Sequence, residues 1–250
     1  MYRFSSLIGY IKSIGVFATI NYLLQRYIFP GPMIILRIPG IKEKIYLRKQ
    51  SKDVNVFHQI FIKQDLGFLK GKKCKVCIDA GANIGLSTII MKNYFPDSYV
   101  YSIEPETENL KMLLLNTNKY KNVVVIDKAL SDNSNGLFFF DTGKGADSFQ
   151  TMQKPIDTNT RMVKSICITD LMNQYNLTSL DFVKIDIEGA EVFCVDQEAL
   201  PWIRQSKLLA IEIHEHFAPG CTNQIFDLVK ENFKFSKNGE YSIFENNSLT

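Results

Sequence analysis

A glycine-containing turn between residues 79 and 85 is the most informative run in this sequence. The apolar stretch that starts at Val76 is typical of a buried strand, and Asp79, Gly81, Asn83 and Gly85 follow it before a helix-like segment. A strand that turns sharply into a helix presents backbone N–H groups at the helix N-terminus, where they can bind acceptor atoms of a ligand. The run therefore predicts a cradle for a nucleotide-like ligand.

The spacing within this turn discriminates between nucleotide-like ligands. Three residues separate Gly81 from Gly85, so the G-x-G-x-x-G fingerprint of dinucleotide-binding folds is missing. Asp79 stands where its charge would repel a pyrophosphate but would suit a ligand that carries an ammonium group. S-adenosylmethionine carries such a group, and it is the cofactor that we predict.

Two later strand ends complete the predicted cofactor pocket. Glu104 ends the strand-like run VYSIE 23 residues after Gly81. This is close to the roughly 20-residue interval at which a βαβ unit presents a carboxylate to ribose hydroxyls. Asp127 ends the run NVVVID, and Ala129 follows it at a position from which a small apolar side chain could line an adenine pocket. We expect these three residues to contact the nucleoside part of the cofactor.

Carboxylates and an imidazole follow two further strand-like runs, VKIDIE and LLAIEIH. The first run contributes Asp186 and Glu188, and the second contributes Glu212 and His214, which lie on one face of a strand with a side-chain period of two. Neighbouring strand ends could bring His214 close to Asp186. Such a group offers a general base or a site for a divalent metal, so Asp186, Glu188 and His214 are candidates for both roles.

Short β-rich runs alternate with helical ones from residue 74 onward. This alternation predicts an α/β fold with a doubly wound, mostly parallel sheet. Near the C-terminus, Asn238 and Gly239 stand between two strand-like runs, which indicates an antiparallel hairpin with a type I′ turn.

The chain divides into three predicted parts: an N-terminal amphipathic helix and linker (1–40), a lead-in subdomain (41–73) and the cofactor-binding domain (74–250). Lys12 and Arg26 bracket only 13 uncharged residues. As a helix these would span about 20 Å of a roughly 30 Å hydrocarbon core. We therefore expect the helix to pack on the main domain or to contact a membrane peripherally. The polar segment 142–160 is predicted to be a mobile loop or lid.

Composition narrows the class of protein. Hydrophobic residues make up 46% of the chain and charged residues 22%, as in ordinary globular domains. Lys and Arg exceed Asp and Glu by only 29 to 26, an excess too small to predict a nucleic-acid partner. Five cysteines scattered through apolar runs favour a reduced, cytoplasmic protein without disulfides.

Taken in order, the motifs IDAGANIGL, IEP, KAL, VKIDIEGAE and IEIH resemble the FkbM-type family of S-adenosylmethionine-dependent methyltransferases. The resemblance extends over roughly residues 45–214. It implies a seven-stranded class I methyltransferase sheet, with Asp79, Gly81, Asn83 and Gly85 around the methionine part of the cofactor and Glu104 on the ribose. It also implies O-methylation of a hydroxyl, commonly on a sugar or a polyketide-like molecule.

The expected function is therefore O-methylation of a small-molecule acceptor, that is, a hydroxyl of a saccharide, a glycoconjugate or a natural product. Two alternatives remain: a nicotinamide-dependent oxidoreductase or epimerase on a similar sheet, and a non-catalytic cofactor-binding module. A nucleic-acid methyltransferase is disfavoured because KIDIEGAE stands where such enzymes carry an Asn/Asp-Pro-Pro-aromatic motif.

Overall fold

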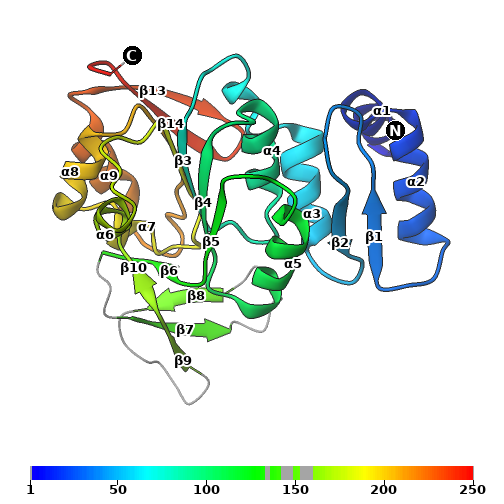
Figure 1. Ribbon diagram of the computed structural model, residues 1–250, viewed down its shortest axis with the longest axis horizontal. Coiled ribbons are helices and arrows are strands. Elements are labelled where there is room, and N and C mark those ends of the chain that lie inside the picture. Colours follow the sequence, from blue (N-terminus) through cyan, green and yellow to red (C-terminus); the bar gives the residue numbers. More distant parts are fainter. Residues whose placement is uncertain (1, 133–135, 142–148, 153–159, 250) are drawn as a thin grey trace.

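A seven-stranded sheet forms the centre of the computed structural model, which describes residues 2–132, 136–141, 149–152 and 160–249 (Figure 1). From one edge to the other the strands are β13 (Phe233–Asn238), β14 (Tyr241–Asn246), β12 (Leu208–Glu212), β11 (Phe182–Ile185), β3 (Val76–Ala80), β4 (Tyr99–Ile103) and β5 (Val123–Ile126). The five strands from β12 to β5 are parallel, and β14 is antiparallel to both of its neighbours. This confirms the predicted doubly wound sheet.

Both faces of the sheet are buried, because successive side chains of a strand point to opposite sides. On β3, Cys77 belongs to one apolar core and Ile78 to the other, and on β11 Phe182 and Val183 divide in the same way. The first core includes side chains from α1 (Tyr2–Ile14), α2 (Val16–Tyr27), α3 (Asp53–Phe57), α4 (Leu86–Tyr94) and α5 (Thr107–Thr117). The second includes side chains from α6 (Ile168–Gln174), α7 (Glu191–Cys194), α8 (Leu200–Arg204) and α9 (Cys221–Val229). The fold is therefore a three-layer α/β/α sandwich.

The C-terminal hairpin confirms the predicted antiparallel pair but corrects its turn. Asn238 pairs with Tyr241, so the two loop residues are Gly239 and Glu240. Of these two, only Gly239 has a positive φ (57°), whereas a type I′ turn needs positive φ at both positions. The reason is that Asn238 is drawn into the strand, where its side-chain amide donates to the Asp65 carbonyl oxygen.

The first forty residues contain more structure than the predicted single helix and linker. Gly15 separates α1 from α2, because its φ of 82° and ψ of 161° end one helix and let the next begin in a new direction, a conformation that favours glycine. The predicted linker includes β1 (Met33–Leu36), which pairs with β2 (Ile45–Arg48). A π-helical turn at His58–Lys63 follows α3. The boundaries at residues 40 and 73 between the three parts of the chain stay a prediction.

Tyr22 tests how firmly α2 belongs to the first core. Its side chain is 3% exposed and its ring stacks on Phe57 at a centroid distance of 5.7 Å. We expect Tyr22→Ala to lower the free energy of unfolding by about 3–5 kcal/mol, measured by urea denaturation. Tyr27→Ala, on the same helix but 74% exposed, should change it by less than about 0.5 kcal/mol. Equal effects of the two substitutions would contradict a shared core.

A second group of strands follows β5. β6 (Ala129–Leu130) pairs with β10 (Ser165–Ile166), and a three-stranded antiparallel sheet has the order β8-β7-β9. Its strands are β7 (Leu137–Asp141), β8 (Phe149–Met152) and β9 (Thr160–Val163). We predicted a loop at 142–160, but Phe149–Met152 within it forms β8, because its backbone pairs with that of β7. Residues 142–148 and 153–159 lie outside the described residues.

Candidate active site

A cavity of about 400 Å³ opens at the carboxyl ends of the central parallel strands. Ligands of doubly wound folds bind at this edge, where the chain crosses from one face of the sheet to the other. Strand ends and the lead-in segment both line it: Gly81, Glu104, Asp186, Glu212, Lys52 and Gln59. The lead-in segment is thus part of the site.

Gly81 lets the turn after β3 pass directly beside the end of β11. Its φ is +73°, and a Cβ at this position would lie 1.8 Å from the Asp186 carbonyl oxygen. The backbone N–H groups of Gly81 and Ala82 both donate to the Ile103 carbonyl oxygen. Gly81 and Asn83, two of the residues predicted to bind the cofactor, line the cavity. Gly85 lies at the start of α4 and packs against α5, so it shapes the turn without lining the cavity.

Asp79 lies beneath the turn and does not line the cavity, contrary to our prediction for it. Its side chain is fully buried, and its Oδ2 accepts hydrogen bonds of 2.6 Å from the hydroxyls of Ser87 and Thr88 at the start of α4. Its Oδ1 lies 3.3 Å from the Nζ of Lys184. The physical reason is that a buried carboxylate needs a nearby cation and donors, and the fold supplies them from within. Asp79 therefore braces the cradle.

Glu104, which we predicted to contact the ribose of the cofactor, lines the cavity. Asn83 donates its backbone N–H to Oε2 at 2.8 Å, and Glu106 donates to Oε1 at 2.9 Å. Burial raises the pKa of Glu104 to about 7, although these hydrogen bonds oppose the shift. The side-chain amide of Asn109 also donates to Oε1, at 3.5 Å. Because a carboxylate oxygen accepts two hydrogen bonds, Oε2 retains acceptor capacity for a hydroxyl such as one of a ribose.

Of the other two residues predicted to contact the nucleoside, Ala129 lines the cavity and Asp127 does not. Ala129 and Leu130 are buried and line the cavity together with Ile103 and Pro105, which gives it an apolar end that suits an adenine ring. Asp127 is exposed, and it is not among the lining residues. The chain turns after Ile126, so that Ala129 and Leu130 of β6 rather than Asp127 line the cavity; contact of Asp127 with the cofactor stays a prediction.

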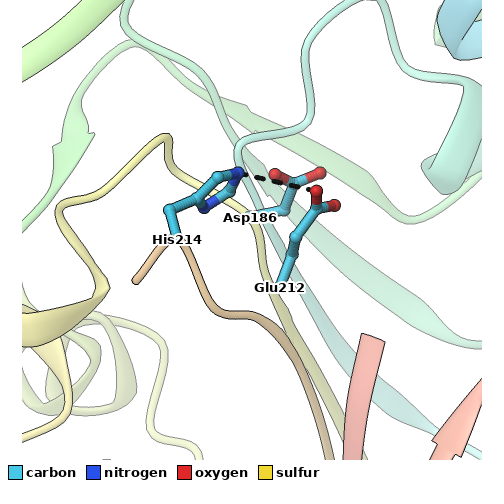
Figure 2. A group of neighbouring side chains, drawn as sticks. All are labelled: Asp186, Glu212 and His214. Atoms are coloured by element: carbon cyan, nitrogen blue, oxygen red, sulfur yellow. Dashed lines mark ion pairs between the residues drawn. The ribbon is translucent and has the colours of Figure 1, made fainter. Parts of the chain in front are cut away.

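Asp186, Glu212 and His214 lie together at the ends of β11 and β12 (Figure 2). One ligand atom from each side chain lies within 4.8 Å of those of the other two. The Nε2 of His214 is 3.5 Å from Glu212 and 3.8 Å from Glu188, while its Nδ1 is hydrogen-bonded at 2.9 Å to the fully buried Glu191. The predicted approach of His214 to Asp186 is confirmed.

The charges around His214 change the role that we predicted for it. Burial would lower the pKa of His214, but hydrogen bonds to Glu191 and Glu212 outweigh that effect and raise the pKa to about 11. A histidine that already carries its proton at neutral pH cannot accept another one. Burial and the neighbouring Asp186 raise the pKa of Glu212 to about 7, so Glu212 suits a general base better than His214 does.

The same residues could hold a divalent cation if the ion displaced the proton on the Nε2 of His214, because a metal-bound histidine is neutral. We predicted Asp186, Glu188 and His214 as ligands, whereas the compact group contains Glu212 in place of Glu188. Glu191 is hydrogen-bonded to the Nδ1 of His214, as a carboxylate outside the ligand set commonly is to a metal-bound histidine, which it orients. Glu188, with a side chain 38% exposed, lines the cavity at its edge.

Sequence reasoning missed several residues of the site. Lys184 is buried between Asp79 and Asp186 and donates to the Gly81 carbonyl oxygen at 2.9 Å. Tyr241, on the C-terminal hairpin, donates a hydrogen bond from its hydroxyl to the Oδ2 of Asp186 at 3.3 Å. A lysine inside the otherwise apolar strand run FVKI was the available signal for Lys184, because a buried lysine needs acidic partners.

The order of the seven strands, with the antiparallel β14 between β13 and β12, is that of class I methyltransferases. Residues 79–235 match the model of the methyltransferase FkbM domain. The chain therefore belongs to the FkbM methyltransferase family, a family of S-adenosylmethionine-dependent enzymes. A search among curated proteins found no match.

Solved structures similar to this chain include three methyltransferases with low sequence identity. Aeropyrum pernix fibrillarin with bound S-adenosyl-L-methionine is 14% identical over 85% of this chain and 81% of that chain, with a TM-score of 0.41. A precorrin-6y C5,15-methyltransferase from Geobacter metallireducens is 11% identical (73% and 84%; TM-score 0.41). A putative rRNA methylase from Clostridium thermocellum is 10% identical (80% and 98%; TM-score 0.44).

Proposed function

We propose that this protein transfers the methyl group of S-adenosylmethionine to a hydroxyl of a saccharide or glycoconjugate in the cytoplasm. The observation that carries the proposal is that one cavity contains both halves of such a reaction. Gly81, Glu104, Asp186 and Glu212 all line it. Gly81 and Glu104 would contact the cofactor, and Asp186 and Glu212 would meet the acceptor hydroxyl that loses its proton. Membership of the FkbM family argues against the nicotinamide-dependent and non-catalytic alternatives.

The residues of this chain fit S-adenosylmethionine. Glu104 keeps acceptor capacity for the ribose, Ile103 and Leu130 offer an apolar surface to the adenine, and the turn at Gly81 closes the cavity beside β11. Asp79 is buried, so it would not contact the ammonium group directly, and Glu188 is the lining carboxylate that would be available to that group. When bound, the cofactor supplies a methyl group on a sulfonium, which is attacked in line by a nucleophile.

Proton removal is the task that the carboxylates of the cavity would perform. A neutral alcohol is a poor nucleophile, and a positioned base typically contributes about 10²–10⁴-fold to the rate. Glu212 would accept the hydroxyl proton on a carboxylate oxygen. His214 would keep its own proton and position Glu212 through the contact of 3.5 Å between them. Lys184 and Tyr241 would position Asp186, since both lie within 3.5 Å of its Oδ2.

The acceptor side of the cavity favours a hydroxyl-rich molecule. The lead-in segment contributes Lys52, Asn55, Gln59 and Asp65, whose side chains can donate to and accept from a sugar. A polyketide-like acceptor would gain little from these groups. This polar lining supports the saccharide over the natural product as the proposed acceptor.

The proposal predicts a pH dependence that originates at Glu212. Its carboxyl must be ionised to act as a base, and its pKa is raised to about 7 by burial and by Asp186. We expect kcat to fall about tenfold per pH unit below that pKa and to level off above it. Measuring kcat between about pH 5 and pH 9 would show this limb, and Glu212→Gln should remove it. A profile that is flat across neutral pH would argue against Glu212 as the base.

An acceptor panel tests the proposed reaction. The full chain is incubated with methyl-labelled S-adenosylmethionine and nucleotide sugars, oligosaccharides, polyketides or small phenols, and label is counted in each acceptor fraction. We expect label in a saccharide fraction. Label confined to the polyketide or phenol fraction would overturn the saccharide assignment but retain O-methylation. Transfer to none of the saccharides, combined with binding of the cofactor, would mean that the acceptor class is wrong.

A further inference from the structure

α2 has two apolar sides, and only one of them is covered. Ala18 and Tyr22 face the core. At 100° per residue, a second arc of about 120° on the other side of the helix contains only apolar or aromatic residues. This arc consists of Val16, Phe17, Ile20, Leu24, Tyr27 and Ile28, and we call it the outer arc.

The outer arc is exposed to an unusual degree. Phe17 is 89% exposed, Tyr27 74% and Ile28 68%, and the neighbouring Phe29 is 50% exposed. Figure 1 shows α2 at one end of the molecule, beyond α3 and β2. A single exposed apolar side chain is ordinary, but a contiguous row of them along one helix indicates a surface that is covered by a partner.

Charge distinguishes between the possible partners. Residues 1–52 contain nine Lys and Arg but one Glu, so the other 198 residues hold 20 of the 29 basic residues and 25 of the 26 acidic ones. The N-terminal part is thus basic and the body acidic. A symmetric dimer through the outer arc would bring two basic regions together, and repulsion would oppose it. A nucleic acid would offer phosphates but nothing for the aliphatic side chains to bury against.

Basic side chains lie near the C-terminal end of the outer arc. The Nζ of Lys49 donates to the Phe29 carbonyl oxygen at 2.8 Å, and Arg26 donates to the carbonyl oxygen of Lys49. Lys12, at the end of α1, is exposed. Apolar and aromatic groups beside Lys and Arg are the composition of helices that lie in the interface of an anionic bilayer.

We propose that the outer arc of α2 binds the surface of a membrane that contains anionic lipids, with the helix lying in the plane of the interface. α2 has 12 residues and is therefore about 18 Å long, shorter than a bilayer core of about 30 Å. No helix in the described part of the chain combines the length and hydropathy that crossing a bilayer requires. The inference goes beyond the proposed function, because none of the outer-arc residues lines the cavity.

Vesicle co-sedimentation of the full chain tests this surface. We expect binding to vesicles of phosphatidylcholine with phosphatidylglycerol, weak binding to phosphatidylcholine alone, and loss of binding as ionic strength rises. Phe17→Glu combined with Ile28→Glu should reduce the partition coefficient at least tenfold. Leu114→Glu, which changes a 47%-exposed leucine on α5, is the matched control and should leave it unchanged. Thermal unfolding of each variant verifies that it is folded.

Three results would overturn the proposal. The first is no binding to either type of vesicle, and the second is equal binding to neutral and anionic vesicles. The third is binding that survives the substitutions at Phe17 and Ile28. A concentration-dependent dimer in sedimentation velocity that the same substitutions abolish, without vesicle binding, would assign the outer arc to a second copy of the chain. Binding of S-adenosylmethionine by the variants is measured separately, so failure here leaves the proposed function untouched.

Discussion

Replacing Glu212 by glutamine is expected to lower kcat by about 10²–10⁴-fold, the contribution that a positioned general base typically makes. The substitution keeps the size of the side chain but removes the group that would accept the proton. Glu212 lines the cavity, and in our proposal it meets the acceptor rather than the cofactor, so the affinity for S-adenosylmethionine should change little. Steady-state turnover and calorimetric cofactor binding, measured on the same preparation, separate the two effects.

Glu245→Gln is the matched control for this experiment, because Glu245 lies on β14 and pairs with Lys72 rather than with any residue of the cavity. It should keep wild-type turnover. Near-normal kcat in Glu212→Gln would contradict the assignment of the base. Loss of activity in EDTA with recovery in magnesium would instead assign Asp186, Glu212 and His214 to a divalent cation that lowers the pKa of the acceptor hydroxyl.

Gly81→Ala should abolish both cofactor binding and stable folding. The added Cβ would lie 1.8 Å from the Asp186 carbonyl oxygen. The backbone at the ends of the neighbouring strands β3 and β11 fixes both atoms, so neither can move cheaply. The steric overlap and the φ of +73° both destabilise the folded state, so we expect the free energy of unfolding to fall by more than about 4 kcal/mol. Urea denaturation measures it.

Gly71 supplies the matched control, since its φ of +84° is equally left-handed but a Cβ there would meet nothing within 4 Å. Gly71→Ala should cost only about 1–2 kcal/mol, the usual penalty of that conformation for a residue with a Cβ. If the two substitutions destabilised the protein equally, the close passage of the turn beside β11 would be wrong.

Much of the fold is predictable because it depends on local patterns. Apolar runs that end in Asp79, Glu104, Asp186 and Glu212 mark four parallel strands, and strand ends gather at one edge of a sheet whatever the details of packing. That rule is enough to place Glu104, Asp186 and His214 in one region of the molecule from the amino-acid sequence alone.

The roles of individual side chains are harder to predict, because they depend on neighbours far away in the sequence. Asp79 is buried because Lys184 reaches it from another strand, and the pKa of His214 is raised because Glu191 hydrogen-bonds its Nδ1. Both partners lie in the motif VKIDIEGAE, which is recognisable in the sequence, but the direction in which each side chain points is set only by the packed fold.

The most direct test of the account is calorimetric titration of the full chain with S-adenosylmethionine and, separately, with NAD. We predict saturable binding of S-adenosylmethionine at one site and no heat with NAD. Glu104→Ala should weaken the binding roughly ten- to hundredfold, the value of hydrogen bonds to a charged acceptor. Glu108→Ala, on the exposed side of α5, should not weaken it. Saturable binding of NAD without binding of S-adenosylmethionine, or wild-type affinity in folded Glu104→Ala, would contradict the proposed cofactor site.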